Sequence, residues 1–306
     1  MSVQLWYFSR NRAIMPELPE VETIARGLRA SLPGRRILAV RLGETDFMDD
    51  PAALERDLPG TRIEDVTRYG KFLLLRLQPA NGSCGSCFLV VHLGMTGQLA
   101  AQPAGEPAAL HTHAQLLLDD GRELRYTDIR RFGRLALVAE PHWENFFGRL
   151  GLDPLEATEE EFRRRLAGRR ARIKAMLLDQ HVFRGMGNIY ADESLWRARI
   201  HPARHAARLS AGQTTQLYRA IRDVLMAAIR LRGSSIANYV DAEGRPGQFQ
   251  QRHRVYGREG KGCFRCGEKI RRVIVAGRSS YFCRQCQPAP RHAKPAHARR
   301  RKPKTI

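Results

Sequence analysis

Residues 263–286 have the sequence CFRCGEKIRRVIVAGRSSYFCRQC. Two Cys-x-x-Cys pairs, Cys263 with Cys266 and Cys283 with Cys286, are separated here by 16 residues. Each pair can hold a metal ion from a tight turn, and four thiolates make a closed tetrahedral site for one structural Zn²⁺. Two disulfides are the alternative. They are disfavoured because the cysteine usage is typical of a reducing compartment. We therefore predict a zinc finger in which residues 269–281 form a β-hairpin.

The turn of this hairpin, at residues 277–280, would be fixed by the metal and would present Arg278. A solvated turn arginine is the alternative interpretation of Arg278, and the rigid hairpin weakens it. A third Cys-x-x-Cys, Cys84 with Cys87, lies in a Gly/Ser-rich loop. Two ligands alone make a poor closed site, so we interpret this pair as an incidental part of a hairpin loop rather than as a redox or metal site.

The chain as a whole is strongly basic. It has 306 residues, a formal net charge of +21, a pI of about 10.6 and 43% hydrophobic residues. Such a charge destabilises a fold by self-repulsion unless a polyanion neutralises it, so nucleic acid is the expected partner. A ribosomal-type or membrane-surface protein is less favoured, because the charge is spread over a patterned, globular sequence. No apolar run approaches the roughly 20 residues that span a bilayer, and residues 1–14 make a poor secretory signal.

The predicted elements are segregated along the chain. Apolar residues at helical spacing over 21–28 predict a first helix. Short apolar or alternating runs then predict strands at 36–42, 71–77, 88–93, 115–118, 123–126 and 134–138. After about residue 152 the period becomes helical, and Thr158 with Glu161 and Ser210 with Gln213 form capping boxes. A β-rich half followed by an α-rich half predicts an α+β multidomain fold.

The segment MPELPEVETIARGL begins at Met15. If Pro16 is the first residue of the mature chain, its nitrogen is a secondary amine. An α-amino group has a pKa of about 8, so much of it is neutral near pH 7. A neutral secondary amine can attack the C1′ atom of a sugar and give an iminium, which promotes elimination of the 3′ phosphate. Glu17 beside it can transfer protons. Taken alone, Pro-Glu is more often a helix-entry device.

From Met15 to about Gln287 the chain resembles the formamidopyrimidine-DNA glycosylase (Fpg) family of DNA glycosylase/AP lyases. The segments that carry the resemblance, in the family's order, are MPELPEVE, RYGKFLLL, HLGMTG, YTDIRRFG, GNIYADESLW, YVDAEGRPGQFQ with VYGREG, and the zinc finger with GRSSYFC. Leu18 stands where the related endonuclease VIII branch has a glycine, which favours the Fpg branch that acts on oxidised purines. The resemblance implies an N-terminal two-sheet β-sandwich, a helix–two-turns–helix (H2TH) domain and a zinc finger, with DNA between the halves.

The expected segments are an extension (1–15), a β-sandwich catalytic domain (16–150), a helical H2TH DNA-binding domain (151–259), the zinc finger (260–287) and a disordered basic tail (288–306). The extension departs from the family. If it stays, the nitrogen of Pro16 is a tertiary amide without nucleophilicity. We therefore expect that synthesis starts at Met15 or that the extension is removed.

The resemblance implies catalytic roles at four positions. Pro16 matches the Schiff-base nucleophile and Glu17 the proton donor. Lys71 matches the lysine that donates a proton in β-elimination and contacts a phosphate. Arg278 matches the finger arginine that grips the phosphates at the lesion and supports δ-elimination. Without the family, an ordinary strand-edge lysine would be the favoured interpretation of Lys71.

Six further positions match DNA contacts of the family: Met95, His111, Arg130, Phe132, Arg169 and Asn188. Met95, Arg130 and Phe132 match the trio that fills the void left by an extruded base. Asn188 follows a glycine-rich segment at a helix N-terminus, where phosphate binding and N-capping are both expected roles. Arg169 belongs to an arginine run that a solvated helix face would also explain. Phe183 and Arg184 depart from the small apolar residues expected there, and predict altered packing or an added phosphate contact.

We therefore predict a bifunctional glycosylase/AP lyase that excises 8-oxoguanine and formamidopyrimidines from duplex DNA through a Pro16 Schiff base and β,δ-elimination. The alternatives are an endonuclease VIII-type enzyme for oxidised pyrimidines and an inactive DNA-binding protein with a blocked Pro16. A sequence-reading zinc-finger regulator is disfavoured, because no recognition helix separates the cysteine pairs. We expect one structural Zn²⁺, damaged double-stranded DNA as partner, no membrane, a monomer, and a bacterial cytoplasmic, nucleoid-associated location.

Overall fold

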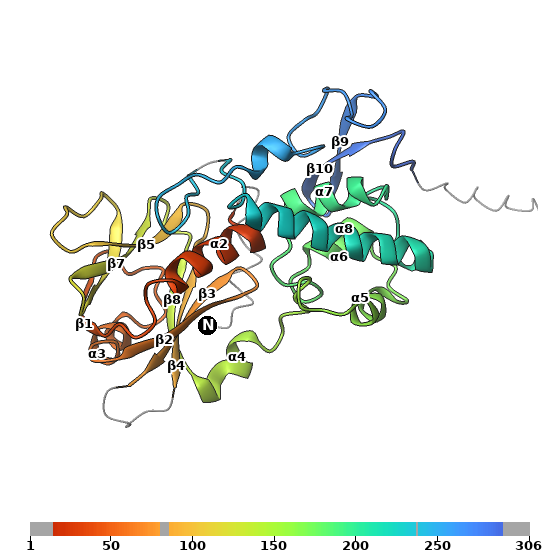
Figure 1. Cartoon of the computed structure of the whole chain (residues 1–306). Helices are drawn as coiled ribbons and strands as arrows, with labels where there is room; N and C mark the ends of the chain where they lie inside the picture. The colour runs from red at the N-terminus through yellow and green to blue at the C-terminus, as the bar shows by residue number, and fades with distance from the viewer. Residues whose placement is uncertain (1–14, 80–85, 237, 290–306) are drawn as a thin grey trace, which may run out of the picture.

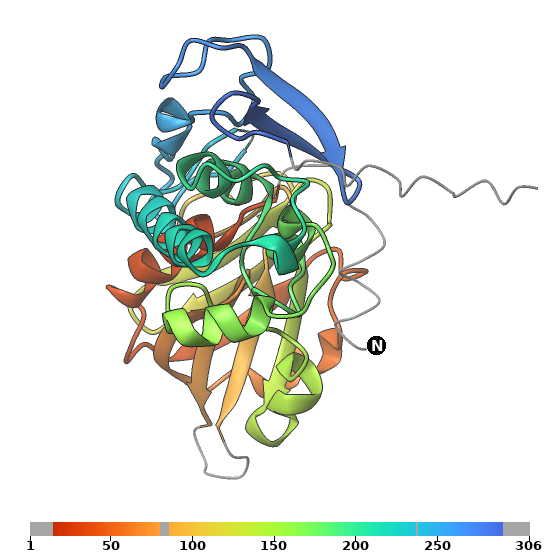
Figure 2. The same ribbon diagram turned by 90° about the vertical axis from the view of Figure 1, so that its right-hand side faces the viewer.

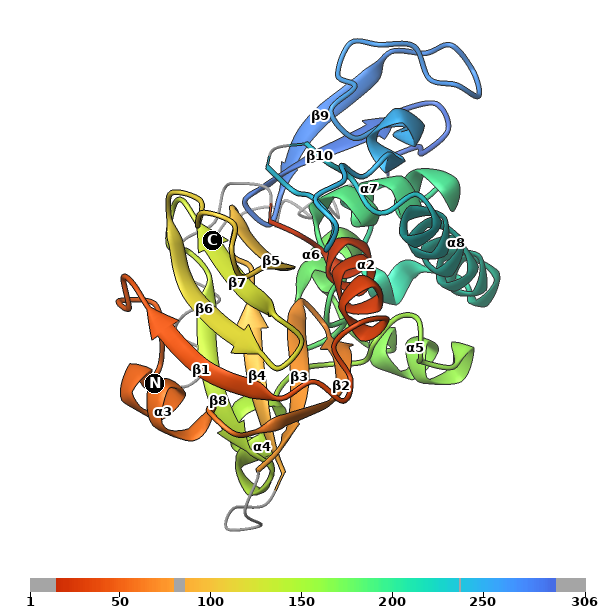
Figure 3. The same cartoon turned by 60° about the vertical axis from the view of Figure 1, so that its left-hand side comes forward.

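Two antiparallel sheets form the first half of the molecule (Figure 3). The computed structural model describes residues 15–79, 86–236 and 238–289. One sheet has the strand order β1-β6-β7-β5 and the other β2-β3-β4-β8. The strands are β1 (Ile37–Leu42), β2 (Arg62–Tyr69), β3 (Phe72–Gln78), β4 (Cys87–His92), β5 (Gly97–Pro103), β6 (Thr112–Leu118), β7 (Arg122–Asp128) and β8 (Arg134–Ala139). The predicted β-sandwich is confirmed.

The sheet that contains β3 is covered on both faces. Leu73, Leu75 and Leu77 point into the core between the two sheets. Phe72 and Leu74 point the other way, into a second cluster that contains residues of the short helix α4 (Trp143–Phe147). This double burial explains why the segment FLLLRL is a continuous apolar run rather than an alternating one.

Two strands escaped prediction. β2 has the charged sequence RIEDVTRY, and β5, GQLAAQP, contains glycine, alanine and proline. β2 contains strand formers such as Ile63 and Val66, but a register shift between Ile63 and Asp65 breaks its apolar alternation. β5 has poor strand propensity, so its conformation depends on antiparallel pairing with β7. β3 pairs antiparallel with β4, as expected of a hairpin, and Cys87 opens β4 as a buried residue. Cys84 and most of the connecting loop lie outside the described residues.

Four helices dominate the second half: α5 (Glu159–Leu166), α6 (Ile173–Leu178), α7 (Asn188–Arg197) and α8 (Ala211–Arg230). The capping boxes at Thr158 and Ser210 are confirmed. The arginine run does not form one helix face, because α5 ends at Leu166 and Arg169 follows in an exposed loop. None of the helices in the described part of the chain has the length and apolar character of a membrane span.

Helix α2 (Leu18–Arg29) lies between the two halves (Figure 1). Val21, Ile24 and Leu28 belong to the core of the sandwich. Leu18, at the start of the same helix, belongs to the helical core instead. The N-terminus of α2 therefore sits where both cores meet, which places the residues just before it at the seam between the halves. The first helix predicted from the sequence is confirmed.

The zinc-finger hairpin stands on the helical half (Figure 2). Its strands are β9 (Ile270–Val275) and β10 (Arg278–Cys283), and its two-residue turn, Ala276 and Gly277, has positive φ angles of 51° and 72°. The predicted turn at 277–280 is therefore wrong, because Arg278 already pairs with Val275 as the first residue of β10. Trp196 of α7 packs in one buried cluster with Cys263 and Cys283. The zinc finger is thus held against α7 by this apolar contact, and the indole N–H of Trp196 also donates to the sulfur of Cys263 at 3.4 Å.

Candidate active site

The carboxylate of Glu17 lies at the N-terminus of α7. Its Oε1 accepts the N–H of Ile189 at 3.0 Å and its Oε2 accepts the N–H of Tyr190 at 3.3 Å. A Cβ atom at Gly187 would lie 2.1 Å from the Cδ of Glu17, so only glycine leaves room for the carboxylate. The anion at this helix end is therefore a group of the protein itself. Asn188 is the first helical residue and Gly187 the N-cap, so the N-cap interpretation of Asn188 is wrong.

Glu17 and Lys71 are both buried and lie close enough for their charges to interact, and we call them the acid–amine pair. Burial raises the pKa of Glu17, and the positive charge of Lys71 opposes that shift. Burial lowers the pKa of Lys71, and the carboxylate of Glu17 opposes that shift in turn. Both net directions favour the uncharged forms, so Glu17 retains its proton to a higher pH than an exposed carboxyl, and Lys71 loses its proton more easily. A carboxyl that keeps its proton longer and an amine that releases its proton more easily can both take part in proton transfer.

The turn between β2 and β3 places Lys71 in this pair. Tyr69 and Phe72 are cross-strand partners, which leaves Gly70 and Lys71 as the two turn residues. Gly70 has a φ of +64°, a left-handed conformation that favours glycine. Lys71 is only 7% exposed. The interpretation of Lys71 as an ordinary strand-edge lysine is therefore wrong.

Lys174 is a further buried cation that the sequence analysis did not single out. Its Nζ lies 2.7 Å from Oδ1 of Asp192 and donates to the carbonyl of Ser279 at 2.8 Å. Ser279 follows Arg278, so this bridge holds the finger hairpin against the helical half. Arg278 thereby comes close enough to lower the pKa values of both Lys71 and Lys174, although burial is the larger cause for each. A lysine in the otherwise apolar helix IKAMLL was the available signal.

Glu20 ties the N-terminal segment to the rest of the site. Its Oε2 accepts the N–H of Glu17 at 2.9 Å, and its Oε1 accepts the N–H of Ser234 at 2.7 Å and the hydroxyl of Tyr190. Burial, together with the charge of Glu17, raises the pKa of Glu20 to about 7. Pro16, half-buried, directly precedes Glu17. The structure therefore brings Glu17, Lys71 and Arg278 together beside Pro16.

A second group of predicted residues lies on two neighbouring loops. We call residues 94–96 and 128–133 the wedge loops. A Cβ atom at Gly94 would lie 2.3 Å from the carbonyl carbon of Phe132, so the loops are in backbone contact. The guanidinium of Arg130 lies 4.5 Å from the ring centre of Phe132. Arg130 is exposed, whereas Phe132 and Met95 are half-buried. The three predicted residues therefore lie on two loops that contact each other.

Asp128, which the sequence analysis missed, organises the wedge loops. Its Oδ1 accepts the hydroxyl of Thr96 at 2.5 Å and the N–H of Arg130 at 3.2 Å. Its Oδ2 accepts the N–H of Gly133 at 2.8 Å. The side chain is fully buried. An Asp placed directly before the segment IRRFG was the signal that could have identified this turn.

The remaining predicted DNA contacts differ in position. His111 is exposed, has a φ of +68°, and accepts the N–H of Asp128 at 3.0 Å through its carbonyl, so it lies beside the wedge loops. Arg169 lies on the exposed loop after α5, apart from these groups in the chain.

His92 was not predicted. Its Nδ1 accepts the N–H of Gly94 at 3.0 Å, and burial, with the charges of Lys71 and Arg134, lowers its pKa to about 3.

The four cysteines fit one zinc ion. Their sulfur atoms all lie within 4.8 Å of one another, and the Cys263–Cys286 and Cys266–Cys283 pairs are 3.9 and 3.5 Å apart. Tetrahedral Zn–S bonds of about 2.3 Å require sulfur separations of about 3.8 Å, whereas a disulfide requires about 2.05 Å. The geometry therefore fits a closed Zn²⁺ site, and the prediction of one structural zinc is confirmed.

Comparisons with known proteins match nearly the whole described chain. Residues 15–135 match the formamidopyrimidine-DNA glycosylase N-terminal domain, residues 150–240 the formamidopyrimidine-DNA glycosylase H2TH domain, and residues 260–289 the zinc finger found in FPG and IleRS. The formamidopyrimidine-DNA glycosylase of Herpetosiphon aurantiacus is 44% identical over 278 residues, which cover 89% of this chain and 100% of that protein. The enzyme of the same name from Solibacter usitatus is 46% identical over 275 residues, covering 89% and 99%.

Solved structures of the Lactococcus lactis Fpg protein have the same fold. Its complex with abasic-site DNA has a TM-score of 0.80 at 33% identity and covers 89% of this chain and 100% of that one. Its complex with Fapy-dG DNA gives the same TM-score, identity and coverage. A complex with DNA that contains an oxidised pyrimidine has a TM-score of 0.80 at 32% identity, with 90% and 100% covered.

Proposed function

Because this chain belongs to the formamidopyrimidine-DNA glycosylase family, we propose that it excises oxidised purines from duplex DNA and then cleaves the strand, with the nitrogen of Pro16 as nucleophile. Members of this family are bifunctional DNA glycosylase/AP lyases. The observation that carries the proposal is the buried pair of Glu17 and Lys71 beside Pro16, at the seam where the two halves meet. The match to the family's N-terminal domain begins at residue 15, which supports a mature chain that starts at Pro16.

In the proposed reaction the free nitrogen of Pro16 attacks C1′ as the bond from C1′ to the damaged base breaks. Glu17, whose pKa burial raises, supplies the proton that leaves with the base. The sugar ring then opens by cleavage of the C1′–O4′ bond, with a proton taken up by O4′, and this gives an iminium between the nitrogen of Pro16 and C1′. The iminium withdraws electrons, so loss of a C2′ proton expels the 3′ phosphate. A second elimination expels the 5′ phosphate. Lys71 transfers protons in the first elimination, and Arg278 stabilises the phosphates.

The wedge loops are proposed to keep the lesion extruded. Met95 and Phe132 fill the void in the base stack, and Arg130 hydrogen-bonds the orphaned cytosine. His111, Arg169 and Asn188 are proposed to contact DNA phosphates. These roles assume the segments given above: a removed extension at 1–15, a catalytic sandwich at 16–150, an H2TH domain at 151–259, a zinc finger at 260–287 and a basic tail at 288–306.

DNA is the partner that the related complexes support. We propose further that the protein acts as a monomer. Its proposed place is the bacterial cytoplasm, in association with the nucleoid, because its relatives are bacterial repair enzymes. The net charge of +21 favours binding of the protein to a polyanion such as DNA.

The test compares two lesions with a chain that begins at Pro16. Strand cleavage is measured on one duplex with 8-oxoguanine opposite cytosine and on one with thymine glycol. Faster cleavage of the 8-oxoguanine duplex is expected. Faster cleavage of thymine glycol would instead support the endonuclease VIII-type alternative, which stays of interest because a relative has been solved with oxidised-pyrimidine DNA. Tight binding without cleavage would support the inactive DNA-binding alternative.

A further inference from the structure

Arg184 contacts several groups of the protein at once. Its Nη1 donates to the carbonyl of Gly151 at 2.8 Å, and its Nη2 donates to Oε2 of Glu156 at 2.9 Å. Its guanidinium lies 4.1 Å from the ring centre of Tyr69. The side chain is only 15% exposed. Of the two expectations for this unusual residue, altered packing is therefore the one that the contacts support.

The contact with Tyr69 joins the two halves of the molecule at the turn that carries Lys71. Tyr69 is the last residue of β2, and Gly70 and Lys71 follow it in the turn. A Cβ atom at Gly70 would lie 3.2 Å from the Cβ of Arg184 and 3.4 Å from the nitrogen of Gly185. The chain at 184–185 thus packs directly on this turn. The ring of Phe147 also contacts the ring of Tyr69, at a centroid distance of 4.9 Å.

The same short segment also supports Glu17. The carbonyl of Gly185 accepts the N–H of Leu18 at 3.0 Å. Gly187 lies directly beneath the Glu17 carboxylate, as described above. Residues 184–187 therefore contact both segments that supply the acid–amine pair. The relative position of Glu17 and Lys71 depends on how firmly each of them is held against these four residues.

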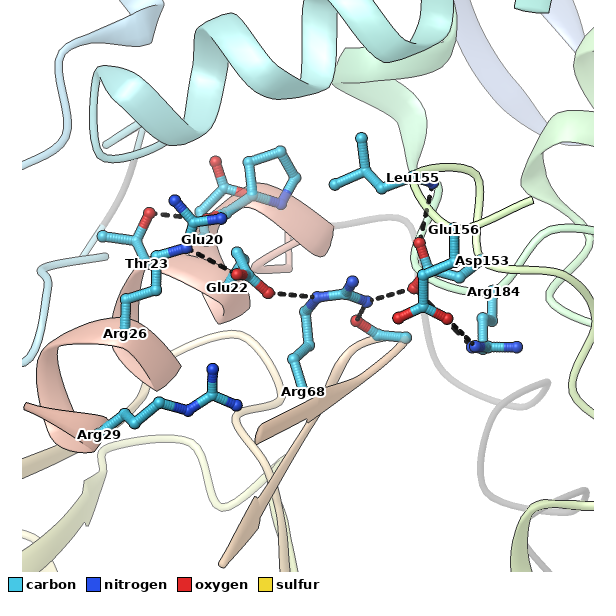
Figure 4. A network of polar contacts seen from close by, with 12 residues as sticks. Glu20, Glu22, Thr23, Arg26, Arg29, Arg68, Asp153, Leu155, Glu156 and Arg184 are labelled. Atoms are coloured by element: carbon cyan, nitrogen blue, oxygen red, sulfur yellow. Dashed lines mark hydrogen bonds and ion pairs between the residues drawn. The ribbon is translucent and has the colours of Figure 1, made fainter. Parts of the chain in front are cut away.

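A buried ion-pair network runs beside this contact (Figure 4). Arg68 donates to Oδ2 of Asp153 at 2.7 Å and to Oε2 of Glu22 at 3.0 Å. The Nε of Arg184 lies 3.8 Å from the same Asp153 oxygen. Since Arg68 remains as the closer partner of Asp153, loss of Arg184 leaves no buried carboxylate without a cation. A substitution at 184 should therefore be tolerated by the fold.

We propose that Arg184 is a positioning residue, which clamps the Tyr69–Gly70–Lys71 turn against the helical half and so sets the placement of Lys71 relative to Glu17. The proposal rests on the proposed function, since its effect is measured through strand cleavage that depends on Lys71. A misplacement of about 1 Å in a catalytic group can slow a reaction by up to about a hundredfold. A shifted turn should therefore lower the rate of cleavage rather than the affinity for DNA.

The test measures single-turnover cleavage of an abasic-site duplex by the full chain starting at Pro16. For Arg184→Met we expect a rate about tenfold lower than wild type, with the half-saturating enzyme concentration little changed. The control is Arg197→Met, which removes an exposed arginine paired with Asp223 and should cleave at the wild-type rate. In a Lys71→Ala background, Arg184→Met should cause no further loss, because the positioned group is gone.

Two outcomes would overturn the proposal: an Arg184→Met rate equal to wild type, or an equal loss in the Lys71→Ala background, which a general structural role would produce. If Arg184→Met does not fold, Tyr69→Leu removes the ring beneath the guanidinium and should give a similar rate loss, while Tyr69→Phe keeps the ring and should retain the rate. Equal rates for these two variants would contradict the clamp. A wild-type chain that cleaves nothing would instead reject the proposed function, and the clamp with it.

Discussion

The seam around Glu17 and the wedge loops are built on different principles. At the seam, carboxylates and amines are themselves buried. Glu17 accepts two backbone N–H groups of α7, Glu20 accepts from both halves, and Lys174 pairs with Asp192. In the wedge loops, one buried carboxylate, that of Asp128, fixes the backbone while the side chains of Arg130 and Phe132 stay accessible. The groups at the seam have their partners within the protein, whereas the side chains of the wedge loops are the ones proposed to contact DNA.

This difference has energetic consequences. A buried acid with a raised pKa is costly to maintain, but it gives a proton donor suited to neutral pH. An accessible aromatic or methionine side chain is cheap to maintain, but it can contribute only when a base has left the stack. Changes at the seam should therefore affect both chemistry and stability. Changes to side chains of the wedge loops should affect only the handling of the lesion.

The largest effect is expected for Glu17→Gln. The amide oxygen can still accept from the first turn of α7, so the fold should be retained, but the proton donor is lost. Single-turnover excision of 8-oxoguanine should slow by roughly 10²- to 10⁴-fold. Binding to an abasic-site duplex serves as the control and should change little. Excision at close to the wild-type rate would mean that the seam does not supply the proton.

Gly187→Ala should damage the seam by steric overlap. The added Cβ would lie 2.1 Å from the Cδ of Glu17, which no rotamer change of a buried carboxyl can easily relieve. We expect a loss of about 1–3 kcal/mol in the free energy of unfolding, together with slower excision. The matched control is Gly212→Ala on α8, where a Cβ meets nothing within 4 Å. The measurement is the urea midpoint of unfolding for Gly187→Ala and for Gly212→Ala. Equal midpoints for the two variants would contradict the described packing.

Glu20 gives the seam a pH dependence. Its pKa rises from 4.5 in the unfolded chain to about 7 in the fold, because of burial and the charge of Glu17. A raised folded-state pKa contributes stability that is complete below pH 4.5 and is lost as the pH rises through 7, by about 3 kcal/mol in total. Urea midpoints measured between pH 5 and pH 8 should therefore fall less in Glu20→Gln than in wild type. Parallel curves for the two proteins would show that Glu20 titrates normally.

The smallest effect is expected in the wedge loops. Phe132→Ala should slow excision from duplex DNA by about tenfold, because extruding a base costs a few kcal/mol and the side chain offsets only part of it. The melting temperature should not change, since the ring is only half-buried. Met226→Ala controls for general surface effects, because it truncates an accessible apolar side chain elsewhere, on α8. A clear drop in melting temperature for Phe132→Ala alone would place Phe132 in the core instead.

Sequence was a good guide where one local pattern fixes the outcome. The spacing of the four cysteines predicted the zinc finger, and the capping boxes at Thr158 and Ser210 predicted helix starts that the structure confirms. The convergence of Glu17, Lys71 and Arg278 followed from the family resemblance, since they are far apart in the chain. β2 could not be predicted because a register shift between Ile63 and Asp65 breaks its apolar alternation. β5 could not be predicted because its glycine, alanine and proline have weak strand propensity.

The contacts that sequence could not predict are the long-range ones. Glu17 binds backbone groups 172 and 173 residues away, and Lys174 donates to a carbonyl 105 residues away. No periodicity within a segment encodes such partners. Arg184 was visible as an unusual residue, but its role as a contact between the halves depends on where Tyr69 lies, which only the folded chain reveals.

The most direct test of the central claim is borohydride trapping on an 8-oxoguanine duplex, combined with the intact mass of the protein. A chain whose mass begins at Pro16 should form a covalent adduct with the DNA, because borohydride reduces the iminium formed by its nitrogen. A chain that retains residues 1–15 should form none. An adduct of equal yield from both chains would contradict the account, since the nitrogen of Pro16 is an amide in the longer chain and another amine would have to be the nucleophile.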